Sequence, residues 1–232
     1  MKNLFVLLSL TLLISCAKKE DVNIKEIISK AYPSVDIEKI RKIDENFHEV
    51  IINNQIYYAT NDGKFLIVGS VIDLNTKESI TENTKMSQRL DVIKSIDDKN
   101  MIIYKPEISD HVLTVFTDSS CPYCQKLHNE IPKLIENNVE IRYVLFSRNG
   151  NNVDAYDQLL SAWCSENRME AIESLFDGDL LDEKDECSNP LNNNYELASR
   201  LSVEGTPTIF LEDGRVIPGY QNYRNILEII NQ

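Results

Sequence analysis

From residue 101 to the end of the chain, apolar segments alternate between a strand pattern and a helix pattern. Short runs rich in β-branched and aromatic residues are followed by longer segments whose apolar residues recur every three or four positions. Such alternation predicts helices packed on a sheet, an α/β arrangement, and a closing hairpin makes that sheet mixed. The expected strands are 101–104, 111–117, 139–146, 208–211 and 215–218, and the expected helices are 123–137 (interrupted by Pro132), 153–176, 194–201 and 226–230.

A smaller α+β unit precedes this region. Residues 22–31 show helical spacing, and the runs 48–53, 55–60 and 64–74 are separated by Asn- and Gly-containing turns, which predicts an antiparallel meander. A unit of about 60 residues buries little core alone, so we expect it to need a partner surface. Residues 81–99 lack Gly and Pro and are predicted to form a helix that connects two domains. The expected organisation is residues 1–15, 16–80, 81–99 and 100–232.

The first fifteen residues are typical of an export signal. Lys2 precedes an apolar stretch from Leu4 to Ile14, which is too short to span a bilayer but matches the apolar region of a secretory signal. Cys16 follows directly and resembles the lipidation site of bacterial lipoproteins. We therefore expect residues 1–15 to be removed and Cys16 to carry a lipid that is the only membrane contact. Ala17 rather than an aspartate comes next, which favours the outer membrane; the alternative is a plain signal peptide with an incidental cysteine.

Charge and cysteine content narrow the possible functions. The formal net charge of −13 argues against nucleic acid or anionic lipid as a main partner. Five cysteines are an odd number for an exported protein, and a lipidated Cys16 would leave four that can form two pairs. Disulfides persist in the oxidising compartments outside the cytoplasm. The four remaining cysteines are Cys121, Cys124, Cys164 and Cys187.

The sequence Cys121-Pro122-Tyr123-Cys124 lies where the strand 111–117 gives way to a helix. The first turn of a helix presents free N–H groups that favour a thiolate over a thiol, and cysteines in such positions have lowered pKa values. The spacing places Cys124 one turn further on the same face. We expect Cys121 to be the exposed nucleophile and Cys124 the partly covered resolving thiol. The residues expected to cap the helix are Asp118, Ser119 and Ser120.

Other uses of these cysteines fit the sequence less well. A zinc site requires a second close pair, whereas Cys164 and Cys187 stand 23 residues apart. A c-type haem site requires histidine directly after the second cysteine, where Gln125 stands. We therefore expect no metal and no cofactor. An inert structural disulfide between Cys121 and Cys124 stays open.

Three further positions have two interpretations each. Pro207, in Gly205-Thr206-Pro207 before the strand 208–211, is either a loop proline or a cis proline that turns the Thr206 backbone toward the cysteines. Tyr123 is either a substrate contact or a half-packed aromatic residue. His128 either tunes the thiols or is a surface or hydrogen-bonded histidine.

Several of these segments together resemble the catalytic domain of the DsbC/DsbG-type periplasmic disulfide isomerases. The resemblance covers about residues 100–232, and the N-terminal part agrees with that family in length and element order. The segments that carry it are 101–104, Phe116-Thr117-Asp118, Cys121-Pro122-Tyr123-Cys124, Lys126-Leu127-His128, Gly205-Thr206-Pro207 and Pro218-Gly219-Tyr220.

The resemblance implies a thioredoxin-like catalytic domain with a helical insertion, a cis Pro207 and a structural disulfide between Cys164 and Cys187. It implies a V-shaped homodimer joined through N-terminal dimerisation domains and linker helices, and a membrane reductase of DsbD type as partner. The implied activity is reduction and isomerisation of incorrect disulfides in unfolded or misoxidised exported proteins of the periplasm. Thr206, Pro207 and Tyr123 are the implied substrate-binding residues.

One departure from the family pattern keeps the direction of exchange open. The family's isomerases commonly carry Gly-Tyr between the cysteines, whereas this chain has Pro122-Tyr123. That dipeptide influences the reduction potential. A net thiol oxidase is therefore the alternative enzyme, and a chaperone-like binding dimer with dispensable cysteines is the alternative of another class.

Overall fold

The structure is a computed structural model that describes residues 22–151, 153–182 and 187–232. The predicted signal peptide and the lipidation site at Cys16 lie outside the described residues. The described residues form two compact units that divide between Gly69 and Ser70, and each is described by itself. No helix within the described ranges is long and apolar enough to cross a membrane.

The first unit packs one helix on a four-stranded antiparallel sheet with the order β1-β2-β3-β4. The helix α1 (Ile24–Ala31) begins at Asn23, whose side chain accepts a hydrogen bond from the Glu26 amide. The core of this unit consists of buried aliphatic residues of the helix and of the two central strands. The strands are β1 (Ile37–Lys42), β2 (Phe47–Ile52), β3 (Gln55–Thr60) and β4 (Leu66–Ile67).

Strand β1 was not expected from the sequence, and β4 is shorter than expected. Strand β1 pairs only with β2, so it is an edge strand and most of its side chains are solvated. Its apolar residues Ile37 and Ile40 are three apart, which is not the alternation of a half-buried strand. The expected strand 64–74 forms only β4, followed by an isolated bridge between Ile72 and Ser79.

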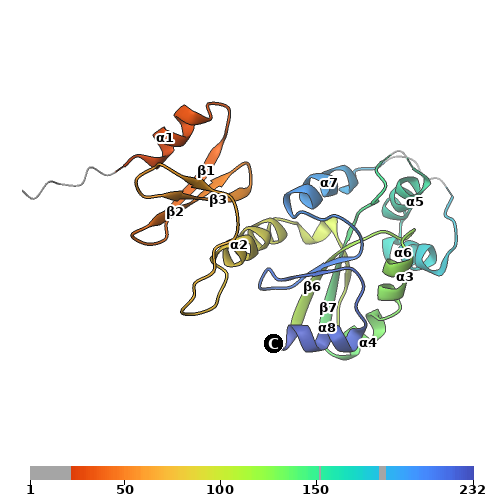
Figure 1. The fold of residues 1–232 in the computed structure, drawn as a ribbon. Coiled ribbons are helices and arrows are strands. Elements are labelled where there is room, and N and C mark those ends of the chain that lie inside the picture. The colour runs from red at the N-terminus through yellow and green to blue at the C-terminus, as the bar shows by residue number, and fades with distance from the viewer. Residues whose placement is uncertain (1–21, 152, 183–186) are drawn as a thin grey trace, which may run out of the picture. The chain divides into compact units, whose positions relative to one another are not determined.

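The second unit is built on a five-stranded mixed sheet with the order β5-β7-β6-β8-β9. Two of its strands, β6 and β7, lie side by side (Figure 1). The central strand β6 runs parallel to β7 and antiparallel to β8. The predicted α/β class and the mixed sheet are confirmed. The strands are β5 (Ile102–Tyr104), β6 (His111–Thr117), β7 (Val139–Leu145), β8 (Thr208–Phe210) and β9 (Val216–Pro218).

Helices cover both faces of this sheet because successive strand residues point to opposite sides. Val115 packs in the larger core with α3, α4, α5, α6 and α8, whereas its neighbour Phe116 packs in a second core with α2 and α7. The helices are α2 (Ile80–Lys94), α3 (Pro122–His128), α4 (Ile131–Glu136), α5 (Asp154–Trp163), α6 (Arg168–Asp177), α7 (Leu191–Arg200) and α8 (Tyr223–Ile230).

Two expected long helices are each divided by side-chain hydrogen bonds. Helix α2 ends at Lys94, where the Ser95 hydroxyl donates to the Val92 carbonyl, and a short 3₁₀ turn follows at Asp98–Asn100. The expected helix 153–176 forms α5 and α6, because the Asn167 side chain caps a new helix at the Glu170 amide.

Helix α2 is held against the turn between β8 and β9 by a close backbone approach. Gly214 has a φ of 86°, and a Cβ atom at this position would clash with the backbone of Met86 on α2. The Arg89 side chain adds a hydrogen bond of 3.3 Å to the Gly214 carbonyl and an ion pair with Glu82. A glycine is therefore required at this turn for α2 to pack there.

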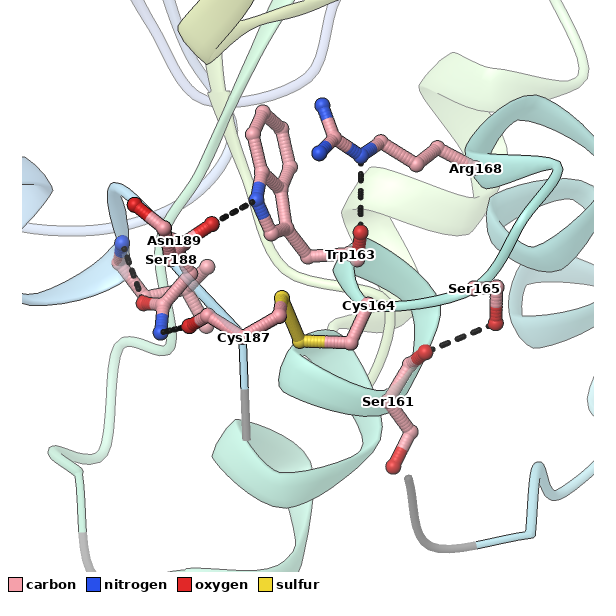
Figure 2. The surroundings of a disulfide bond; sticks show 9 residues. Ser161, Trp163, Cys164, Ser165, Arg168, Cys187, Ser188 and Asn189 are labelled. Atoms are coloured by element: carbon pink, nitrogen blue, oxygen red, sulfur yellow. Dashed lines mark hydrogen bonds between the residues drawn. A yellow bond between two sulfur atoms is a disulfide. The ribbon is translucent and has the colours of Figure 1, made fainter. Parts of the chain in front are cut away.

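A disulfide joins Cys164 at the end of α5 to Cys187, the pair that the family resemblance implies (Figure 2). Next to it, Trp163 is buried, and its indole N–H donates to the Ser188 carbonyl at 3.3 Å. The Arg168 guanidinium lies 3.9 Å from the centroid of the Trp163 ring. The disulfide thus attaches the segment after α6 to the end of α5.

Replacing both cysteines in a Cys164→Ser, Cys187→Ser variant is expected to lower the free energy of unfolding by about 3 kcal/mol, because a loop of this size loses its closure in the unfolded chain. Urea denaturation followed by Trp163 fluorescence measures the change. Ser165→Ala, which removes only a hydrogen bond to the Ser161 carbonyl, is the matched control. An unchanged midpoint in the double variant would contradict a structural role for this disulfide.

Candidate active site

The two central cysteines lie at the carboxyl end of β6, where the chain turns into α3. Thr117 ends the strand, and Cys121 is the residue at which the helix begins. Pro122 occupies the first helical turn, where its missing N–H leaves no intrahelical bond unmade.

The expected capping role of Asp118, Ser119 and Ser120 is wrong, because no side chain within the described residues caps α3. Asp118 instead organises the turn before the helix. Its buried carboxylate accepts hydrogen bonds from the Ser120 amide at 2.9 Å and the Ser120 hydroxyl at 2.7 Å. It also accepts one from the Arg148 amide at 3.1 Å, which links this turn to the loop after β7.

The loop before β8 lies directly against Cys121. Thr208 pairs with Phe116 near the end of β6, so the residues just before Thr208 reach the start of α3. The Thr206–Pro207 peptide bond is cis, and the Cys121 thiol donates to the Thr206 carbonyl at 3.3 Å. Strand pairing therefore places Thr206 and Pro207 beside the cysteine pair.

The expectation that Cys121 is exposed is wrong for this structure. Cys121 and Cys124 are both free thiols, and both have a relative exposed area of 0%. Because the Cys121 sulfur lies against the Thr206 carbonyl, that loop contributes to the cover. Any reactant can reach the sulfur only when part of this cover moves.

The surroundings of Cys121 favour its thiolate. Burial has the largest single effect on its pKa and raises it, but several hydrogen-bond donors oppose burial. They are the Thr206 side chain, the backbone N–H groups of Cys124 and Tyr123, and the Cys124 thiol. Together these donors outweigh burial and hold the pKa of Cys121 below its ordinary value of 9.0.

Cys124 is shifted in the opposite direction. Burial raises its pKa to about 12, and a negative charge on Cys121 adds to the effect. The hydroxyl groups of Thr117 and Thr206 oppose this shift only partly. Both hydroxyl oxygens are buried, and neither has a conventional hydrogen-bond partner among the described residues, so each is free to turn toward sulfur. The pair thus consists of one easily ionised thiol and one that strongly retains its proton.

A surface groove runs along the other side of the Thr206 loop. Its volume is about 270 Å³, and its walls come from α2, the end of α7 and the β8–β9 hairpin. The residues lining the groove include Arg89, Leu201, Glu204, Pro207, Val216 and Pro218.

Tyr123 lies in the first turn of α3 and 57% of its surface is exposed. The Lys126 ammonium lies 5.3 Å from the centroid of its ring.

His128, which the sequence left open, is a buried and hydrogen-bonded histidine. Its ring nitrogens lie 3.3 Å from the Tyr143 hydroxyl and 3.1 Å from a Glu173 carboxylate oxygen. No sequence pattern indicates these partners, because Tyr143 and Glu173 belong to a strand and a helix that are distant along the chain. No cluster of His, Cys, Asp and Glu suited to a metal ion occurs among the described residues.

Comparisons with known proteins agree with this geometry. Residues 98–232 match the model of a thioredoxin-like domain, and residues 15–82 match that of the disulfide bond isomerase protein N-terminal domain. Over the whole chain and 96% of the relative, the sequence is 33% identical to a thiol:disulfide interchange protein DsbC of Dickeya dadantii. The chain belongs to the DsbC family.

A second curated relative supports this assignment, and two solved structures share the fold. The DsbC of Escherichia coli K12 is 30% identical over the whole chain and 97% of its own length. A disulfide interchange protein of Neisseria gonorrhoeae has a similar fold, with a TM-score of 0.52 at 24% identity over 59% of this chain and 96% of that one. Proteus mirabilis ScsC reaches a TM-score of 0.51 at 22% identity over 63% of this chain and 77% of its own. As a DsbC family member, the chain is a thiol–disulfide oxidoreductase.

Alkylation of Cys121 by iodoacetamide is expected to follow a pH profile with a midpoint below 9.0, because the reactive species is the thiolate and its pKa is lowered. Cys124, with a pKa of about 12, is expected to remain unmodified over the same range. Mass spectrometry of digested protein reports both sites. A midpoint equal to that of an unstructured cysteine peptide would contradict stabilisation of the thiolate.

Proposed function

We propose that Cys121 and Cys124 are the redox pair with which this protein reduces and isomerises incorrect disulfides in exported proteins. The observation that carries the proposal is the opposite pKa shift of two thiols one helical turn apart. A thiolate is the attacking species in disulfide exchange, so Cys121 is the nucleophile, and the protonated Cys124 does not compete with it.

The reaction begins when the Cys121 thiolate attacks one sulfur of a substrate disulfide. The substrate S–S bond breaks, a mixed disulfide forms, and the released substrate sulfur takes up a proton. If a substrate thiolate then attacks the mixed disulfide, Cys121 is regenerated and the substrate disulfide has been rearranged. If Cys124 attacks instead, the substrate leaves reduced and a Cys121–Cys124 disulfide remains. That disulfide requires an external dithiol reductant, which we assign to a membrane reductase of DsbD type.

The Thr206–Pro207 loop and Tyr123 are the proposed substrate contacts. The Thr206 carbonyl lies 3.3 Å from the Cys121 sulfur, so a peptide chain that displaces the thiol's hydrogen bond enters next to this backbone. The groove behind Pro207 offers mixed apolar and charged walls to residues flanking the substrate cysteine. The exposed Tyr123, two residues after Cys121 in the first turn of α3, adds an aromatic surface.

A net oxidase is the second candidate, and the lowered pKa of Cys121 favours it. A stabilised thiolate stabilises the dithiol state, which makes the disulfide form a stronger oxidant. The same property is compatible with an isomerase only when a reductant keeps the pair reduced. The redox state of Cys121–Cys124 in cells separates these two functions.

We further propose a periplasmic homodimer that is anchored, through a lipid on Cys16, to the outer membrane. Large apolar side chains are exposed on the first unit around its short edge strand β4, with Phe65 at 66% and Val68 at 77% exposure. Burial of such residues is favourable by roughly 1.5–3 kcal/mol for each fully covered side chain, which supports a second copy as the cover. The exposed set is Phe65, Ile67 and Val68 in and beside β4, with Val22, Ile27 and Tyr32 in and beside α1.

Cys121→Ser is expected to abolish refolding of a scrambled disulfide protein, because no sulfur remains to start the exchange. Cys124→Ser is the matched variant and is expected to accumulate the mixed disulfide with substrate, seen on a non-reducing gel. Trapping the thiols of the native chain in cells is expected to show a mainly reduced pair. A mainly oxidised pair would support the oxidase, and full refolding activity of Cys121→Ser would support a chaperone-like dimer.

The full chain is expected to sediment as a dimer at micromolar concentration, and Val68→Asp to shift it toward monomer, because an unpaired charge is costly to bury. Ile108→Asp is the control, since Ile108 is a similarly exposed apolar residue of the second unit. A native chain that sediments as a monomer would contradict the dimer.

A further inference from the structure

Cys124 must lose its thiol proton before its sulfur can attack the mixed disulfide. Burial raises the pKa of this thiol far above neutral pH, so the group keeps its proton near pH 7. An acceptor for this proton is therefore needed during the second half of the reduction reaction. It must lie close to a buried sulfur and communicate with solvent.

A line of polar groups lies in the same core as Cys124, and a charge on Cys124 affects the ionisation of its first member, Tyr143. His128 follows Cys124 by four residues on α3, so the two side chains occupy the same face one turn apart. Tyr143 of β7 pairs in register with Val115 of β6 and packs in the same core as Cys124. Its hydroxyl lies 3.3 Å from His128 Nδ1.

The line reaches the surface on the other side of the imidazole. His128 Nε2 lies 3.1 Å from the carboxylate of Glu173 on α6, whose side chain is 46% exposed. The imidazole is itself buried and stacked on Phe176, with ring centroids 4.1 Å apart and an interplanar angle of 11°. Phe176 therefore fixes the plane of the ring that connects a buried phenol with an exposed carboxylate.

These contacts determine the direction of proton movement. A carboxylate only accepts, so Nε2 carries a proton toward Glu173 and Nδ1 is left as an acceptor for the Tyr143 O–H. The oxygen of Tyr143 then retains a lone pair that can accept from a thiol. The groups that face His128 are Cys124 of its own helix, Tyr104 of β5, Tyr143 of β7 and Glu173 of α6.

We propose that His128, acting through the Tyr143 hydroxyl, is the proton acceptor for Cys124 when this thiol resolves the mixed disulfide. The Cys124 proton moves to the Tyr143 oxygen as the Tyr143 proton moves to His128 Nδ1. The Cys124 sulfur attacks the Cys121 sulfur, the bond from Cys121 to the substrate breaks, and the substrate sulfur leaves with the electron pair. The Glu173 carboxylate stabilises the imidazolium, which then loses its proton to solvent. This inference rests on the proposed function of the cysteine pair.

The chemistry agrees with the perturbed ionisation of the two phenols. Burial raises the pKa of Tyr143 well above its ordinary value, and negative charges at Tyr104, Cys124 and Glu173 raise it further. Burial and the Glu173 carboxylate likewise raise the pKa of Tyr104. Tyr143 therefore conducts a proton without remaining ionised, and His128 is the group that holds the charge. His128 and Tyr143 are accordingly positioning and relay residues, since the reacting atoms are the three sulfurs.

The test separates the two half-reactions on the full-length reduced protein. An aromatic disulfide reagent reacts with Cys121 and releases one coloured thiol in the first step; attack by Cys124 releases a second. Tyr143→Phe keeps the ring and removes only the hydroxyl, and Glu173→Gln changes a half-exposed group. Tyr156→Phe, which removes a buried hydroxyl bonded to Asn192 instead, is the matched control. His128→Gln completes the set, with thermal unfolding measured for each variant.

The first step is expected to change less than twofold in every variant. The second step near pH 7 is expected to slow about 100-fold in Tyr143→Phe and His128→Gln, the usual contribution of general base catalysis. In these two variants the second rate is expected to rise about tenfold per pH unit, because hydroxide must then remove the proton, whereas the native chain shows a shallower slope.

Two results would overturn the relay. An unchanged second step with an unchanged pH slope in Tyr143→Phe would exclude the tyrosine path while leaving Cys121 and Cys124 as the redox pair. Absence of the first step in the native chain would remove the proposed function itself, and with it this inference. A loss that appears equally in Tyr156→Phe would assign the effect to packing and would also overturn the relay.

Discussion

The pairing of β8 with the end of β6 is the interaction on which the site depends. It is a short antiparallel ladder, yet it positions the Thr206–Pro207 peptide against a cysteine 85 residues earlier in the chain. The cysteine pair alone would be two thiols at a helix start. With the second strand in place, the Thr206 carbonyl meets the Cys121 sulfur and the Thr206 hydroxyl influences both thiols.

The opposite pKa shifts of the two thiols follow from how deeply each sulfur lies in the fold. Cys121 lies at the junction, where backbone N–H groups and side-chain donors outweigh burial. Cys124 is one turn deeper in the larger core, where burial dominates and the pKa rises. One helix start thus supplies both an easily ionised thiol and a thiol that strongly retains its proton.

The sequence predicted what is encoded locally or by a specific motif. Alternating strands and helices predicted the fold class, and the Cys121–Cys124 spacing predicted two thiols together at a helix start. Strand β1 was missed because an edge strand has no need of alternating apolar residues. The cover over Cys121 and the role of Asp118 were missed because both depend on loops that meet only after folding. The partners of His128 belong to β7 and α6, and no spacing rule connects these elements with the residue's own helix.

The glycine at the β8–β9 turn has an effect beyond the turn itself. Arg89, which forms part of the groove wall behind Pro207, is attached to the carbonyl of the same Gly214 whose missing side chain admits the Met86 backbone. Any larger residue at position 214 would push α2 outward and carry the arginine with it. The shape of the groove beside the Thr206–Pro207 loop therefore depends in part on the absence of a side chain at Gly214, where the sequence itself shows only a common reverse-turn residue.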